Sequence, residues 1–295
     1  MESNGTPAHA DTRGVSKRIA VVGAGTMGRG ITQTCATYGH DVVWIDVNRE
    51  ILEKGFGVVT RFLHRKVEKN EISREQCDAV IKRIVISESM ESLSDVHLII
   101  ECVFEEMSLK KKLFGEFYKY CPPEAIAATN TSSLSITEIA SASKHPDKVI
   151  GLHFFNPVPL MKLLEIIRGA KTSDETLDQS LEFARTIEKE TVIAKDSPGF
   201  IVSSLLDTFI IEAVAMVQEG VATPEDIDKA IRLGLNHPMG PLELGDMIGW
   251  DVLHNIINYF HSEFQDPKYR ESQLMRRMVR AGWLGRKSGK GFYAY

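Results

Sequence analysis

Short apolar runs alternate with longer stretches of helical periodicity through the first two thirds of the chain. A run of about four to eight apolar or β-branched residues fits a buried strand, and a helical pattern between two such runs is typical of a βαβ unit. The pattern predicts strands at residues 18–22, 42–46, 96–102, 125–129, 149–155, 162–167 and 191–195. This order predicts an α/β domain with a mainly parallel sheet.

Helical patterns fill the connections between these runs. Residues 48–68 place Ile51, Val58 and Phe62 at helical spacing. The stretch 107–120 is expected to be a second helix, with a solvated side that carries Lys110, Lys111, Lys112, Glu116 and Lys119. We expect this lysine-rich side to lie outside the core, because lysine is seldom fully buried.

The alternation ends at residues 196–199, which read Asp-Ser-Pro-Gly. Beyond them the pattern predicts helices only, at residues 200–218, 224–233, 242–264 and 269–281. Thr223 followed by Pro224, with Asp226 three residues after the threonine, is a typical helix start. We therefore expect a flexible polar tail at residues 1–15, an α/β domain at 16–197 and an all-α domain at 198–295.

The composition narrows the class of protein. The chain has 295 residues, of which 43% are hydrophobic and 25% charged, as in an ordinary globular protein. A net charge of −5 argues against a nucleic-acid partner, which usually meets a concentrated basic face. Four widely spaced cysteines without a C-x-x-C pair indicate free thiols and no bound metal. The sequence shows neither an apolar leader nor a stretch long enough to cross a membrane. These features together predict a cytoplasmic protein.

A glycine-rich loop follows the first predicted strand. It comprises Gly23, Ala24, Gly25, Thr26, Met27 and Gly28, and so has the form G-x-G-x-x-G. Between a strand and a helix, this spacing provides a tight turn, a close backbone approach to a pyrophosphate and close helix–strand packing. The loop predicts a Rossmann-like dinucleotide site.

The second predicted strand ends at Asp46, 23 residues after Gly23. A carboxylate at about this distance commonly binds the adenosine ribose hydroxyls and repels a 2′-phosphate, which favours NAD over NADP. Arg49, three residues further on, could weaken that preference.

A nicotinamide cofactor that oxidises an alcohol needs a general base, and histidine is the usual one near neutral pH. Eight of the nine histidines fall in the tail, in helices, in loops or at the start of a strand. His153 instead ends a predicted strand, where open α/β sheets place their ligands. It is followed by the stretch FFNPVP.

Seven stretches resemble the 3-hydroxyacyl-CoA dehydrogenase family, in family order and at family spacing: GAGTMGRGI, IIECVFEEMSLKKKLF, ATNTSSLSITEIA, GLHFFNPVPLMKLLEII, DSPGFIV, HPMGPLELGDMIG and GWLGRKSGKGFY. The resemblance extends from Lys17 to Tyr295. It implies reversible oxidation of an (S)-3-hydroxyacyl-CoA to the 3-oxoacyl-CoA with NAD, on a short acyl chain such as 3-hydroxybutyryl-CoA. It also implies a homodimer formed by the helical domain, a substrate bound between the domains, and a place in either fatty-acid oxidation or butyrate and polyhydroxybutyrate synthesis.

The resemblance assigns roles to individual residues. His153 matches the general base, Glu165 the carboxylate that orients it, and Ser132 a serine that contacts substrate and cofactor. A carboxylate that accepts one imidazole N–H fixes the tautomer and leaves the other nitrogen as the base. Four further positions match family contacts to NAD or coenzyme A, with Lys110 directed at a coenzyme A phosphate: Glu105, Lys110, Asn156 and Lys287.

One substrate-binding position departs from the family. Ser203 and Ser204 stand where the family normally has Asn-Arg, and the asparagine positions the substrate. Loss of one such polar contact typically costs about 1–3 kcal/mol, so slower turnover or an altered substrate pose is expected.

Two rival hypotheses about the function stay open. One is a weakly active or non-catalytic NAD- or CoA-binding member of the fold, which has been reused as a lens structural protein. The other is a β-hydroxyacid dehydrogenase acting on free acids, which HFFNPVP fits poorly.

Overall fold

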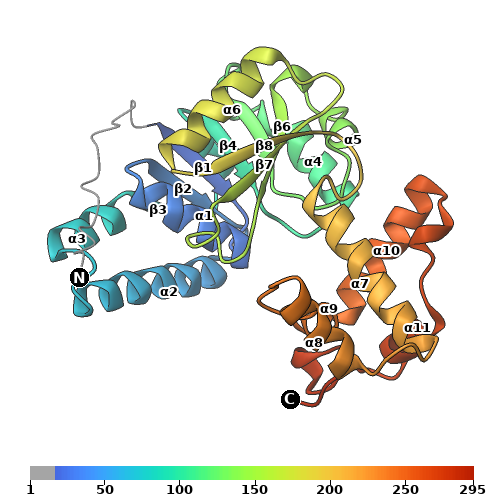
Figure 1. Ribbon diagram of the computed structural model, residues 1–295. Coiled ribbons are helices and arrows are strands. Elements are labelled where there is room, and N and C mark those ends of the chain that lie inside the picture. Colours follow the sequence, from blue (N-terminus) through green and yellow to red (C-terminus); the bar gives the residue numbers. More distant parts are fainter. Residues whose placement is uncertain (1–16) are drawn as a thin grey trace. The chain divides into compact units, whose positions relative to one another are not determined.

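The computed structural model describes residues 17–295 and divides after Asp196 into two compact units. The first unit combines strands and helices, and the second is helical, as Figure 1 shows. The predicted tail at residues 1–15 and residue 16 lie outside the described residues. The predicted fold class, an α/β domain followed by an all-α domain, is confirmed.

The first unit is built on one eight-stranded sheet of order β3-β2-β1-β4-β5-β6-β7-β8. Its strands are β1 (Arg18–Val22), β2 (Asp41–Ile45), β3 (Ile84–Ser87), β4 (Leu98–Glu101), β5 (Ile126–Thr129), β6 (Val149–Phe154), β7 (Leu163–Arg168) and β8 (Glu190–Lys195). All neighbours are parallel except β6 and β7, so the predicted mainly parallel sheet is confirmed. Strand β3 was not expected, because its short edge run directly follows a helical pattern.

Six α-helices connect and cover these strands: α1 (Thr26–Thr37), α2 (Arg49–Glu68), α3 (Arg74–Lys82), α4 (Met107–Phe117), α5 (Ile136–Ala140) and α6 (Asp174–Thr186). Apolar residues of α1, α2 and α6 pack on one face of the sheet, together with Leu98 and Ile100 of β4. Ile99 lies between them in the strand and is directed to the opposite face, as strand geometry requires. The central strands are therefore buried on both faces.

The expectation that Lys110 lies on a solvated side of its helix was wrong. Its side chain is 1% exposed, as deep as Phe114 and Phe117 of the same helix. These three residues are four and three positions apart, so they share one face of α4, and that face is buried. The spacing of the three residues predicts a buried Lys110, whereas the polarity of lysine alone predicts an exposed one.

The second unit contains α7 (Val202–Gln218), α8 (Pro224–Gly234), α9 (Pro241–Ile248), α10 (Trp250–Phe264) and α11 (Gln273–Arg280). The helix expected at 242–264 is in fact two, because Gly249 has a φ of +107° and breaks the helix there. The expected start of α8 is confirmed, since the Thr223 hydroxyl accepts the N–H of Asp226. None of the helices in residues 17–295 is long and apolar enough to cross a membrane.

A buried carboxylate ties the end of the chain to this unit. Asp246 accepts hydrogen bonds from the Trp250 indole at 2.5 Å and from the backbone N–H groups of Phe292 and Tyr293 at 2.9 Å. A Cβ on Gly291 would lie 1.8 Å from an Asp246 oxygen. The stretches HPMGPLELGDMIG and GKGFY thus contain residues that are required by packing.

Candidate active site

The glycine loop has two positions fixed by packing and one that faces open space. Gly23 has a φ of +111°, and a Cβ there would lie 2.7 Å from the Cys102 carbonyl oxygen. A Cβ on Gly28 would lie 1.9 Å from the Gly23 oxygen. Around Gly25 a Cβ would meet nothing within 4 Å. Gly25 is also the N-cap of α1, which has no side-chain cap, so the helix amides and the open space suit an anionic pyrophosphate.

Asp46 lies at the carboxyl end of β2 and is held by the backbone. Its Oδ2 accepts the N–H of Ala24 at 2.7 Å, and its Oδ1 accepts the N–H of Asn48 at 3.0 Å. Arg49 forms an exposed ion pair with Glu53 at 2.8 Å. The carboxylate is thus oriented beside the glycine loop while the nearest arginine has its own partner, a residue set that fits NAD.

A methyl group at Gly25 is expected to weaken NADH binding without harming the fold. Its backbone is extended, with φ −70° and ψ −170°, so alanine fits the conformation and fills only the open space. We expect the NADH dissociation constant of Gly25→Ala to rise at least about tenfold, since the backbone can no longer approach the phosphates. Fluorescence titration measures this, with Gly57→Ala in α2, also in open space, as control. Unchanged affinity would disprove the assignment.

His153 and Glu165 lie opposite each other on two antiparallel strands. The register of β6 and β7 pairs them directly, and His153 Nδ1 is 2.6 Å from Glu165 Oε2. The glutamate is fully buried and the histidine nearly so, with the Phe155 ring centred 4.4 Å from the imidazole. Because a carboxylate only accepts, Nδ1 is the donor, and Nε2 is the nitrogen suited to exchange a proton with a substrate. The separation of 12 residues reflects the strand pairing.

Ser132 lies in the loop after β5, the strand next to β6. Its N–H donates to Glu105 Oε1 at 3.2 Å, and the Thr131 hydroxyl donates to the same oxygen. Asn130, two residues before Ser132, accepts the backbone N–H of Phe154 through its side-chain Oδ1 at 2.8 Å. This hydrogen bond ties the serine loop to the end of β6, beside His153.

Lys110 is enclosed by two carboxylates. Its Nζ lies 2.8 and 3.0 Å from the two oxygens of Glu101, and 3.3 Å from Glu105. Burial by itself would lower the pKa of Lys110, but the charges of Glu101 and Glu105 outweigh it and raise that pKa above its usual value. Its contact with a coenzyme A phosphate stays a prediction. Glu101, the acid that interrupts an apolar strand, is a polar group of this region that the sequence did not single out.

The remaining predicted residues are divided between the units. Asn156 precedes Pro157 across a cis peptide bond, two residues beyond the end of β6. Lys287 belongs to the helical unit, where it forms an ion pair with Asp251. Ser203 is half-buried in the first turn of α7. Ser203 and Lys287 therefore lie in the second unit. The other predicted residues belong to the first unit, most of them at or just beyond the carboxyl ends of β1, β2, β4, β5 and β6, whereas Glu165 lies within β7 and Lys110 in α4.

Two exposed apolar residues near the glycine loop were also missed. Val47 is 93% exposed just beyond β2, and Phe104 is 84% exposed beyond β4. These strands flank β1 on its two sides. Apolar side chains at these two strand ends suit the flat faces of an adenine ring, a signal visible only once the strand order is known.

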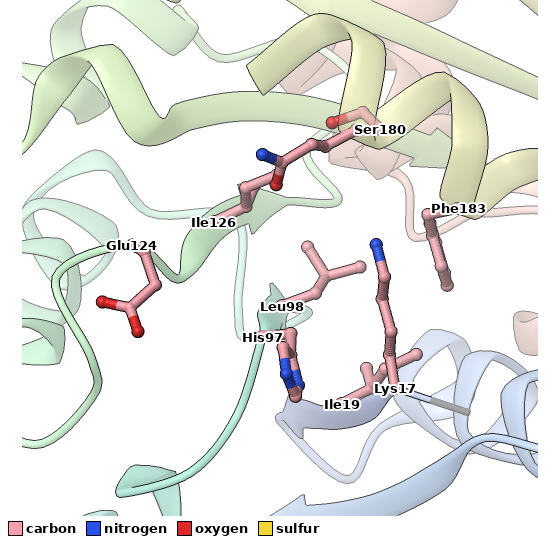
Figure 2. Close-up of a pocket in the computed structure, with 9 residues that line it drawn as sticks. Lys17, Ile19, His97, Leu98, Glu124, Ile126, Ser180 and Phe183 are labelled. Atoms are coloured by element: carbon pink, nitrogen blue, oxygen red, sulfur yellow. The ribbon is translucent and has the colours of Figure 1, made fainter. Parts of the chain in front are cut away.

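A cavity of about 130 Å³ lies at the opposite edge of the sheet, where β1, β4 and β5 begin. Figure 2 shows Lys17, His97 and Leu98 around it, with Phe183 of α6 on one side. Open α/β sheets bind their ligands at the carboxyl ends of the strands, and no predicted site residue lines this cavity. We assign it no part in the chemistry.

Comparison with known proteins identifies the family. The model of the 3-hydroxyacyl-CoA dehydrogenase NAD-binding domain matches residues 18–197, and that of the C-terminal domain of the same family matches residues 199–295. The chain is 47% identical over 279 residues to a probable 3-hydroxybutyryl-CoA dehydrogenase of Bacillus subtilis (strain 168), covering 95% of this chain and 97% of the relative. A 3-hydroxybutyryl-CoA dehydrogenase of Clostridioides difficile is 46% identical, with 94% and 99% covered.

Among solved structures, that of the (S)-3-hydroxybutyryl-CoA dehydrogenase from Ralstonia eutropha is similar, with a TM-score of 0.92 and 42% identity. The similarity covers 95% of this chain and 99% of that one. The predictions of family, of fold class and of NAD as the cofactor are confirmed. This chain belongs to the 3-hydroxyacyl-CoA dehydrogenase family.

Proposed function

We propose that this dehydrogenase interconverts (S)-3-hydroxyacyl-CoA and 3-oxoacyl-CoA with NAD, and that a short acyl chain, as in 3-hydroxybutyryl-CoA, is its preferred substrate. The observation that carries the proposal is the buried contact of 2.6 Å between His153 and Glu165. The pair lies at the end of β6, on the same sheet edge as the glycine loop. The relatives named above support the short acyl chain.

The chain's own residues account for the proton chemistry. Glu165 holds the imidazole of His153 through Nδ1, so Nε2 takes the proton of the substrate hydroxyl, and the carboxylate stabilises the resulting imidazolium. In this proposal the Ser132 hydroxyl donates a hydrogen bond to the reacting oxygen. NAD, when bound, supplies the hydride acceptor. In the reductive direction the imidazolium returns its proton to the same oxygen.

We also infer a homodimer in the cytoplasm. The helical unit exposes several large apolar side chains, including Leu205, Leu233 and Leu235, which supports a subunit interface in that unit. The four cysteines are free thiols, which supports a reducing compartment. Sedimentation equilibrium should give twice the monomer mass of 33.0 kDa, and a monomer would refute the dimer.

The function is tested by mixing the protein with NADH and acetoacetyl-CoA and following NADH absorbance. Rapid loss of NADH, with slower loss for longer 3-oxoacyl-CoA substrates, is the expected result. Activity on free acetoacetate alone would instead favour a β-hydroxyacid dehydrogenase. Retained NADH binding without any turnover would favour a non-catalytic member of the family.

The departure at Ser203 makes a separate prediction. Serine is shorter than the family asparagine and lacks its combined donor and acceptor, so Ser203→Asn should increase kcat/KM for acetoacetyl-CoA by about tenfold. Ser204→Ala, one residue along the same helix, serves as the matched control and should leave kcat/KM unchanged. A rate for Ser203→Asn that stays level or falls would show that the serine is not a handicap.

A further inference from the structure

A buried carboxylate that the reaction does not use directly lies at the end of β4. Glu101 is fully buried and accepts hydrogen bonds on both oxygens. Lys110 Nζ contacts both of them, Val103 N–H donates to Oε1 at 2.6 Å, and the Thr129 hydroxyl donates to Oε2 at 2.7 Å. The donors come from α4, from the loop after β4 and from β5. Glu101 thus joins three segments at the sheet edge that carries the site.

A buried ion pair of this kind is poorly explained by stability alone. Removing two charges from water is unfavourable, and apolar residues of similar volume often replace such pairs without loss of stability. Lys110 has a further contact that apolar residues could not make, since its Nζ lies 3.3 Å from Glu105 Oε2. Glu101 therefore holds the ammonium group of Lys110 in one position, in contact with Glu105.

Glu105 connects that cation to the serine loop. Its side chain is 40% exposed, and a solvated glutamate without a fixed partner retains several rotamers. Here one oxygen contacts Lys110, and the other accepts hydrogen bonds from the Ser132 N–H, the Ser133 hydroxyl and the Thr131 hydroxyl. Lys110 thus fixes one oxygen of the Glu105 carboxylate while the other oxygen binds the serine loop.

We propose that Glu101 is a positioning residue for Ser132, acting through Lys110 and Glu105. Glu101 fixes the ammonium of Lys110, this ammonium fixes the Glu105 carboxylate, and Glu105 holds the backbone that carries the Ser132 hydroxyl. We call these three charged residues the Glu101 relay. Only the last step, from Ser132 to the substrate oxygen, rests on the function proposed above.

The relay predicts a specific pattern of kinetic coupling. Glu101→Gln should lower kcat for acetoacetyl-CoA about 10- to 100-fold, because a shift of about 1 Å at a reacting group has effects of that order. In a Ser132→Ala background the same substitution should change kcat by less than about twofold, since residues that act in series are not additive. Equal losses in both backgrounds would mean general structural damage and would overturn the proposal.

A second variant distinguishes loss of the relay from misfolding of the protein. Glu101→Leu combined with Lys110→Met replaces the buried ion pair by apolar groups of similar size, which is compatible with folding. We expect native-like unfolding with the same loss of kcat as for Glu101→Gln. Lys111→Met removes an exposed lysine of the same helix, paired with Glu138 at 3.2 Å, and should leave kcat unchanged. Full kcat in the double variant would overturn the proposal.

Hydrogen exchange tests the relay without using activity. The backbone N–H groups of residues 130–136 should exchange at least about tenfold faster in Glu101→Gln and in the double variant, because the loop loses its anchor. Lys111→Met should exchange like the wild type. If the wild type fails to reduce acetoacetyl-CoA, the proposed function fails while this measurement still decides on the relay. Unchanged exchange in both relay variants would refute the positioning role.

Discussion

His153→Gln should lower kcat for acetoacetyl-CoA by about 10²- to 10⁴-fold, the range that general acid–base catalysis contributes. NADH affinity should stay unchanged, because the glycine loop and Asp46 lie on other strands of the sheet. Glu165→Gln should also lower kcat, since a neutral amide neither fixes the tautomer nor stabilises the imidazolium. Steady-state kinetics and NADH titration of both variants provide the measurement.

A second buried histidine supplies the control. His40 is 2% exposed and bonds through Nε2 to the Thr186 hydroxyl at 2.8 Å. His40→Gln should therefore alter the free energy of unfolding and leave kcat near the wild-type value. If His153→Gln retained more than about a tenth of the wild-type kcat, His153 would not be the general base.

Asp207→Asn should make the protein more stable at pH 8 than the wild type, by up to about 4 kcal/mol. Asp207 is 3% exposed on α7, and within residues 17–295 its Oδ2 has no hydrogen-bond partner. Burial raises its pKa from 3.8 to about 7. A group whose pKa is raised by folding is stabilising only when protonated, so stability falls as pH rises from about 4 to about 7.

The difference between variant and wild type isolates this contribution. Urea unfolding at several pH values should show a lower free energy of unfolding for the wild type than for Asp207→Asn. This difference should grow between about pH 4 and about pH 7 and stay constant at higher pH. Glu212→Gln changes an exposed acid of the same helix and should alter the unfolding free energy by less than about 0.5 kcal/mol. A difference in unfolding free energy that does not vary with pH would show that Asp207 does not titrate as described.

Local patterns in the sequence were sufficient for much of the fold. The first strand, the glycine loop and the cap at Thr223 each depend on a few adjacent residues, and each was predicted where it occurs. The single helix expected at 242–264 failed because apolar spacing continues through Gly249, while the backbone there requires a positive φ. Apolar spacing alone does not reveal such a break.

Less of the candidate site could be predicted from the sequence, because its contacts join residues that are far apart in the chain. Glu101 and Lys110 stand nine positions apart on a strand and the following helix. The sequence did not single out Glu101, and Lys110 was expected to be solvated because of its polarity. Their mutual burial follows from the packing of α4, with Phe114 as its neighbour on the same face. His153 was found from its place at a strand end, whereas its pairing with Glu165 depends on the register of β6 and β7.

In the reductive direction, His153 gives a proton and NADH gives a hydride to the C3 carbonyl of a 3-oxoacyl-CoA. The most direct test supplies acetoacetyl-CoA with NADH that carries deuterium at both C4 positions, and analyses the product by mass spectrometry. The wild type should form 3-hydroxybutyryl-CoA with one deuterium, located at C3, and His153→Gln should form almost none. Bound NADH with no labelled product from the wild type would refute this reaction.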